Sequence, residues 1–143
     1  MHVSETMTRD VQLARPEQTI QDAARAMAGI DAGALPVADG DRLIGMITDR
    51  DIAIRAIAAG KGPQTKVKEV MTSDVKYCVE DQDVEEVARN MGDIQVRRLP
   101  VVNRDKRLVG ILSLGDIAFT ADGKASEALS GISRPGGAHT QTG

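Results

Sequence analysis

The sequence predicts an α/β (α+β) fold in which one β-α-β-β-α unit occurs twice. Three observations predict it: the chain matches itself, helical apolar stripes recur in both halves, and short apolar runs flank polar turns. The length of 143 residues suits one compact domain or two small ones. Because a unit of about 60 residues is only marginally stable alone, we expect the two copies to pack together with pseudo-two-fold symmetry.

The internal repeat covers nearly the whole chain. Identical residues follow in the same order when Val3 is placed on Val67 and, after one extra residue in the second copy, when Gly45 is placed on Gly110. The longest matches pair Met7-Thr8 with Met71-Thr72, Leu35-Pro36-Val37 with Leu99-Pro100-Val101, and Asp51-Ile52-Ala53 with Asp116-Ile117-Ala118. The predicted organisation is repeat 1 at residues 3–59, a linker at 60–66, repeat 2 at 67–121 and a flexible C-terminal tail at 122–143.

Each repeat is expected to hold a first helix, a hairpin and a second helix. The first helices carry apolar residues at helical spacing, and Thr19 can cap the earlier of them. Polar turns between two short apolar runs predict the hairpins, because such turns join neighbouring strands. The turns lie at 39–41 and 103–105, and the second helices begin near Asp49 and Leu114.

The composition narrows the functional classes. With 18 basic and 21 acidic residues, a net charge of −3 and 1% aromatic residues, the chain is poorly suited to bind nucleic acid. Its two histidines lie near the termini, so no catalytic histidine is expected, and no cluster has metal-ligand spacing. No apolar run approaches the ~20 residues of a membrane span, and the single cysteine, Cys78, is expected to be a small buried strand residue. We therefore expect a soluble cytoplasmic protein that is not an enzyme, needs no metal, and binds neither nucleic acid nor membrane.

The duplicated pattern of Met-Thr, Leu-Pro-Val and a glycine strand leading through Thr or Ser to Asp resembles the cystathionine-beta-synthase (CBS) domain. The resemblance covers residues 3 to 121, and a tandem pair of such domains is called a Bateman module. It implies a stand-alone bacterial-type module that binds an adenosine-containing ligand, such as AMP, ADP, ATP, NAD or S-adenosylmethionine, in the cleft between the repeats. It further implies a homodimer with a regulatory, non-catalytic role and an unidentified protein partner.

The chemistry is expected where a strand becomes a helix. The resemblance assigns Thr48 and Ser113 to phosphate or ribose contact, and Asp51 and Asp116 to the ribose hydroxyls, because a carboxylate accepts strong hydrogen bonds from them. The alternative is a helix capping motif, which has the same spacing and which Thr19 also begins. If the aspartates contact a ligand, replacing either with alanine weakens binding and leaves the melting temperature nearly unchanged.

The rest of the expected site comprises cations for the phosphate and apolar walls for the adenine. Arg50, Arg97 and Arg98 are the candidate cations, since guanidinium groups hold phosphate oxygens bidentately. The alternative interpretation of these arginines is that they are ordinary solvated side chains, and the alternative for the wall residues is that they belong to the strand core. Because Gly33 and Ala34 stand where repeat 2 has Arg97 and Arg98, the two sites are expected to differ in affinity. The candidate walls are Ala34, Leu35, Leu99, Leu13 and Tyr77.

Three other functions remain open from the sequence. The first is a ligand-free dimerisation or protein-interaction module, and the second helix of repeat 1 favours a dimer contact because Ile52, Ile54 and Ile57 give it apolar residues on more than one face. The second is an enzyme acting on a nucleotide, for which the sequence offers no evident nucleophile or base. The third is a nucleic-acid-binding protein, for which the chain lacks the positive charge.

Overall fold

The computed structural model describes residues 1–94, 97–113 and 115–117. The predicted tail at 122–143 and most of the second helix of repeat 2 lie outside these residues. The chain forms two compact units. We call Gln12–Val75 the central unit, and Met1–Val11 together with the described residues from Lys76 onward the terminal unit.

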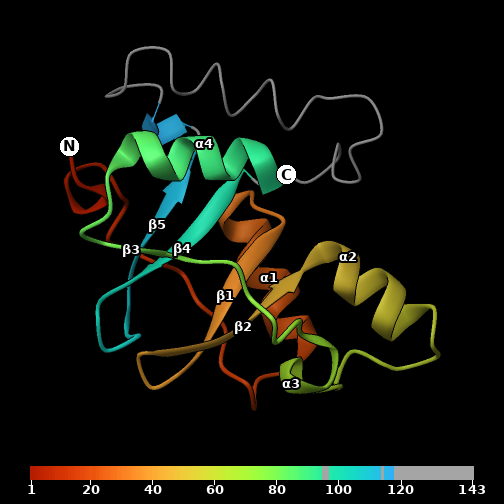
Figure 1. The fold of residues 1–143 in the computed structure, drawn as a ribbon. Helices are drawn as coiled ribbons and strands as arrows, with labels where there is room; N and C mark the ends of the chain where they lie inside the picture. Colours follow the sequence, from red (N-terminus) through yellow and green to blue (C-terminus); the bar gives the residue numbers. More distant parts are fainter. Residues whose placement is uncertain (95–96, 114, 118–143) are drawn as a thin grey trace. The chain divides into compact units, whose positions relative to one another are not determined.

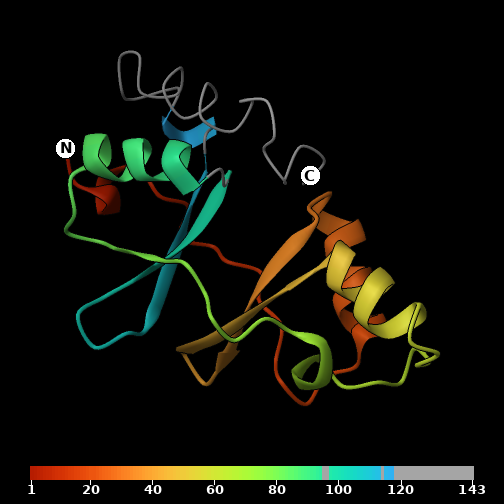
Figure 2. The same ribbon diagram turned by 45° about the vertical axis from the view of Figure 1, so that its right-hand side comes forward.

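The central unit contains a two-stranded hairpin and three helical segments. Figure 2 shows α1 and the turns of α2 and η2 beside the hairpin of β1 and β2. Its core is formed by apolar residues from all of these elements, including Ile20, Leu35 and Ile47. The elements are α1 (Ile20–Ile30), β1 (Ala34–Asp39), β2 (Arg42–Thr48), α2 (Asp49–Asp51), the π-helical η2 (Ile52–Ile57) and α3 (Val67–Val70).

The helices of the central unit begin and end where the local sequence predicts. The Thr19 hydroxyl accepts the backbone N–H of Asp22 at 3.1 Å. Of the apolar stripe predicted for α1, Ile20, Ala23 and Met27 are buried and Ala24 is exposed. The second helix begins at Asp49 and continues through η2, in which the N–H of Ala58 reaches the carbonyl of Ala53. It ends ahead of Gly60, whose φ of +81° is the left-handed conformation that glycine adopts readily.

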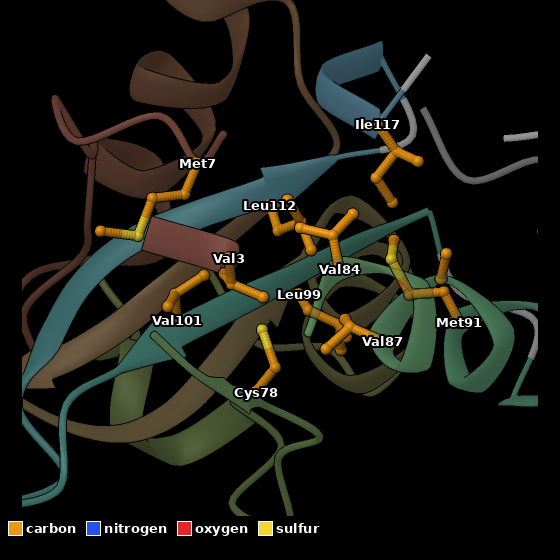
Figure 3. Packing of buried hydrophobic residues seen from close by; sticks show 11 residues of the cluster. Val3, Met7, Cys78, Val84, Val87, Met91, Leu99, Val101, Leu112 and Ile117 are labelled. Atoms are coloured by element: carbon orange, nitrogen blue, oxygen red, sulfur yellow. The ribbon is translucent and has the colours of Figure 1, made fainter. Parts of the chain in front are cut away.

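The terminal unit contains matching elements, but it begins with η1, which corresponds in the repeat alignment to α3 at the end of the central unit. It contains η1 (Val3–Glu5), β3 (Cys78–Val79), α4 (Val84–Ile94), β4 (Arg98–Val102) and β5 (Leu108–Ser113), with sheet order β3-β4-β5. Residues 115–117 are helical, as the predicted start of the second helix requires. Figure 3 shows Val3 and Met7 packed with Leu99, Val101 and Leu112 in one apolar core. Cys78 belongs to this core and is 2% exposed, which confirms that it is a buried strand residue.

The Met-Thr segments that begin the two repeats are exchanged between the units. Thr8 pairs with Ile111 of β5 in the terminal unit, whereas Thr72 pairs with Met46 of β2 in the central unit. Each pairing consists of two backbone hydrogen bonds of 2.8–2.9 Å. The central unit is therefore one continuous stretch of chain inserted into the terminal unit, and Figure 1 shows the N-terminal residues leading away from the β4–β5 hairpin before α1 begins.

Each exchanged segment lies over a glycine. A Cβ atom at Gly45 would stand 2.8 Å from Met71 Sδ and 2.8 Å from the carbonyl oxygen of Thr72. At Gly110 it would stand 2.6 Å from Met7 Sδ and 2.9 Å from the carbonyl oxygen of Thr8. The matched glycines of the two repeats thus permit the close approach of the matched Met-Thr pairs. Among the helices of the described ranges, none is both long and apolar enough for a bilayer crossing.

Candidate functional site

The strand-to-helix junction of the central unit places a hydroxyl and a carboxylate together. Thr48 ends β2, and its Oγ1 accepts the backbone N–H of Asp51 at 3.0 Å. In return, Asp51 Oδ2 accepts the backbone N–H of Thr48 at 3.1 Å. These reciprocal bonds form a capping box, which fixes the carboxylate at the start of α2.

The terminal unit has the same arrangement. Ser113 Oγ accepts the backbone N–H of Asp116 at 3.2 Å, and Asp116 Oδ2 accepts the N–H of Ser113 at 3.0 Å. The sequence motif therefore has one local structure in both repeats. Thr19 and Asp22 form a third such box at the start of α1, so the capping alternative is realised at all three motifs.

Capping engages only one oxygen of each candidate carboxylate. Asp51 Oδ1 lies 3.8 Å from Arg55 Nε, and the Asp51 side chain is 13% exposed. Asp116 Oδ1 lies 3.5 Å from the hydroxyl of Thr8, which belongs to the exchanged N-terminal segment. The Oδ1 atoms are therefore the positions at which either carboxylate could accept a further hydroxyl.

The first residue of the preceding strand lies directly across the hairpin from each hydroxyl. Ala34 pairs with Thr48 and Arg98 pairs with Ser113, so the structure brings the members of each pair together. Ala34 is half-buried and Arg98 is exposed. Leu35 and Leu99, in contrast, are each 1% exposed and belong to the unit cores, so the structure shows them as core residues and not as surface walls.

The other predicted site residues are two exposed arginines and two residues that precede the outer strand positions. Arg50 and Arg97 are exposed, and Arg50 stands beside Asp51 with its backbone N–H bonded to Asp49 Oδ1. Leu13 and Tyr77 precede the outer-strand residues Ala14 and Cys78, which pair with β1 and β4 on the sides away from β2 and β5. Tyr77 is 40% exposed, with Lys106 Nζ 5.8 Å from its ring centre.

A family comparison agrees with the duplicated architecture. The model of the CBS domain matches twice, at residues 3–57 and 67–122. The chain belongs to the CBS-domain family. Both CBS repeats contain the junctions described above, and each match spans residues from both compact units.

A curated relative and several solved structures align with most of this chain. The CBS domain-containing protein YhcV of Bacillus subtilis (strain 168) is 42% identical over 133 residues, which cover 92% of this chain and 94% of YhcV. Three solved CBS-pair structures align over most of both chains. The structure of Hypoxic Response Protein I with two coordinated zinc ions has a TM-score of 0.75 and 38% identity, and the alignment covers 84% of this chain and 98% of that one. CBSX2 in complex with AMP has a TM-score of 0.74 and 26% identity, with 84% and 95% covered. The CBS pair of MJ0100 with 5′-methylthioadenosine and S-adenosylmethionine has a TM-score of 0.71 and 30% identity, with 87% and 98% covered.

The structure also reveals residues that the sequence reasoning missed. Arg55 was not singled out, although its position four residues after Asp51 places the two side chains on one helix face. A pocket of about 340 Å³ between α1 and α2 of the first CBS repeat was missed too. No sequence motif marked this pocket, and the close approach at its lining residue Gly33, where a Cβ atom would lie 2.8 Å from Asp49 Oδ2, is seen only in the structure. The pocket is lined by Ala24, Met27, Ala28, Asp31, Ala32, Gly33, Asp49 and Ile52.

The titratable groups outside the junctions have structural roles. Burial raises the pKa of the Cys78 thiol to about 12, so it is a poor nucleophile near neutral pH. Hydrogen bonds from Lys66 and Lys68 lower the pKa of Glu17 to about 2, which ties both lysines to the loop before α1. Within the described ranges of this CBS pair, no group of three His, Cys, Asp or Glu side chains could hold a metal ion.

Proposed function

We propose that this CBS pair is a regulatory module without catalytic activity that binds an adenosine-containing ligand at the strand-to-helix junctions of its repeats. The observation that carries the proposal is the presence, in both repeats, of a capped carboxylate with one oxygen outside the cap. CBSX2 and the MJ0100 pair support it, because AMP, 5′-methylthioadenosine and S-adenosylmethionine have the adenosine group in common.

The proposed chemistry uses the cap and the ligand together. The capping box holds the Asp51 and Asp116 side chains in one rotamer, so little side-chain entropy is lost when a ligand binds. Each Oδ1 would then accept a ribose hydroxyl in a charge-assisted hydrogen bond, which is stronger than a neutral one. Thr48 and Ser113, which cap the same junctions, would contact the ribose or a phosphate. Leu13 and Tyr77 would contact the adenine.

The two sites are proposed to differ in their preference for phosphate. Arg98 lies across the hairpin from Ser113, whereas Ala34 occupies this position beside Thr48. Arg97 adds a second guanidinium to the repeat 2 site, and Arg50 is the nearest candidate in repeat 1. Because guanidinium groups favour phosphate oxygens, a nucleotide with more phosphates should prefer the site of Ser113 and Asp116.

A dimeric assembly is part of the proposal. Ile54 and Ile57 on η2 are 54% and 60% exposed. Large apolar side chains grouped on an exposed helix commonly mark a protein contact, and a second copy of the chain is the proposed occupant. The same observation favours the second candidate function, a dimerisation or protein-interaction module without a ligand.

The experiment is a thermal-melt screen with AMP, ADP, ATP, NAD and S-adenosylmethionine, followed by calorimetric titration of any ligand that stabilises the protein. Asp51→Ala and Asp116→Ala should each weaken binding about tenfold or more, since each removes a charged hydrogen bond. Asp22→Ala is the matched control, because Asp22 makes the same cap without belonging to the site. It should lower the melting temperature and leave affinity unchanged. If none of the five compounds stabilises the protein at millimolar concentration, the ligand-free module is favoured instead.

A further inference from the structure

Arg55 lies between the Asp51 carboxylate and a segment of the second CBS repeat. Its Nε stands 3.8 Å from Asp51 Oδ1. Its Nη1 donates to the carbonyl oxygen of Met71 at 3.2 Å and lies 3.4 Å from that of Val70. These carbonyls end α3, where a cation interacts favourably with the helix C-terminus. One guanidinium therefore links Asp51, the carboxylate proposed to bind ribose, to the chain that follows α3.

The segment that Arg55 contacts lies just before the chain passes from the central unit to the terminal unit. Met71 and Thr72 belong to the second CBS repeat by sequence, yet they pack in the central unit. Thr72 exchanges two backbone hydrogen bonds with Met46, and Met71 covers Gly45. After Val75 the chain enters the terminal unit. Any change in how firmly Arg55 holds Met71 thus acts on the connection that leads to the other unit.

We propose that Arg55 is a positioning residue that orients Asp51 for the ligand and couples ligand binding to the Val70–Thr72 segment. This inference rests on the proposed function of Asp51. A ribose hydroxyl that donates to Asp51 Oδ1 shares this oxygen with Arg55, because each carboxylate oxygen has two acceptor sites, and the ordered carboxylate in turn fixes the guanidinium against the carbonyls of Val70 and Met71. The segment is then held more firmly in the liganded state than in the free state, which is the differential interaction that a ligand-driven change requires.

The two repeats differ at this position. The oxygen of Asp116 that corresponds to Asp51 Oδ1 lies 3.5 Å from the Thr8 hydroxyl. The residue that matches Arg55 in the repeat alignment is Thr120, which lies outside the described residues. We therefore assign the coupling to the first repeat, where Arg55 is described.

The test combines calorimetry with amide hydrogen exchange on the full chain. The probe is whichever of the five adenosine compounds binds the wild-type protein most tightly. In the wild type it should slow exchange at the Met71 and Thr72 amides. Arg55→Gln should weaken binding about two- to tenfold and abolish this slowing. Arg55→Lys keeps the charge, but one ammonium cannot face the carboxylate and both carbonyls, so it should restore affinity only in part. Arg25→Gln, at an exposed arginine of α1, is the matched control and should behave as the wild type.

A ligand-free measurement separates failure of this inference from failure of the proposed function. Exchange of the Thr72 amide is compared in Asp51→Asn, in Arg55→Gln and in the double variant. Coupling predicts that each single variant speeds exchange and that the double variant adds little. Additive effects, or a ligand response in Arg55→Gln equal to that of the wild type, overturn the coupling. If the wild type binds none of the five compounds, the proposed function fails, and with it the ligand-orienting role, while the ligand-free cycle still decides the link between Asp51 and the segment.

Discussion

Replacing Gly45 with alanine tests the exchange of the Met-Thr segments. The added Cβ would stand 2.8 Å from two atoms, Met71 Sδ and the Thr72 carbonyl oxygen. The flexible Met71 side chain can move at little cost. The Thr72 carbonyl cannot, because it accepts the Met46 N–H at 2.9 Å. Overpacking of this kind costs about 1–3 kcal/mol, and each kcal/mol lowers the melting temperature of a unit this small by about 4–8 °C.

Calorimetry or circular dichroism would measure the effect, with Gly29→Ala as the control. Gly29 lies in α1, and a Cβ atom added there would meet no other atom within 4 Å, so alanine should stabilise the helix by about 1 kcal/mol. The two substitutions therefore have opposite expected signs. A melting temperature for Gly45→Ala equal to or above that of the wild type would refute the placement of Met71 and Thr72 over β2.

Three further predictions address the unit boundaries, the buried thiol and the exposed apolar face. A fragment of residues 12–75 should fold cooperatively by circular dichroism, whereas one of residues 3–59 should not, because it lacks the segment that pairs with β2; equal behaviour would contradict the insertion. The raised pKa of Cys78 keeps its proton on the folded state between pH 9 and about 12, so the free energy of unfolding should fall over this range by up to about 1.4 kcal/mol per pH unit more than in Cys78→Ala. Equal slopes in denaturant titrations would oppose a buried thiol. Ile57→Lys should shift the protein toward monomer in analytical ultracentrifugation, and an unchanged mass would place any dimer contact elsewhere.

The local features of the fold could be predicted from the sequence because short-range interactions determine them. Thr19 caps α1 where the motif indicates, and the hairpin turn falls at residues 40–41, within the predicted 39–41, with Asp39 as the last residue of β1. The family and the double repeat followed from motifs that recur in register. The cap at Asp51 was also readable from the spacing, and it corrects one expectation: because Asp51 Oδ2 bonds to the backbone, Asp51→Ala should cost about 0.3–1.5 kcal/mol of stability as well as affinity.

The exchange of the Met-Thr segments could not be predicted from the pattern. Met7-Thr8 and Met71-Thr72 are identical pairs, and the strands that receive them both carry a glycine, Gly45 or Gly110, at the contact. Either pair therefore fits either sheet by local chemistry. The difference in burial between Ala34 and Leu35 could not be predicted either. A strand of apolar residues does not by itself reveal which of its positions faces a core.

The capping and ligand interpretations of Asp51 and Asp116 do not exclude each other. A carboxylate has two oxygens and about four acceptor sites, and the cap accounts for one hydrogen bond to Oδ2. Asp22 makes the same cap at the start of α1, which follows a loop and not one of the two hairpins. At Asp51 and Asp116, in contrast, the second oxygen faces Arg55 or Thr8, and these residues lie next to or within the exchanged segments. The feature that distinguishes a binding carboxylate from a cap is therefore the environment of its second oxygen, and comparing Asp22→Ala with Asp51→Ala measures that difference directly.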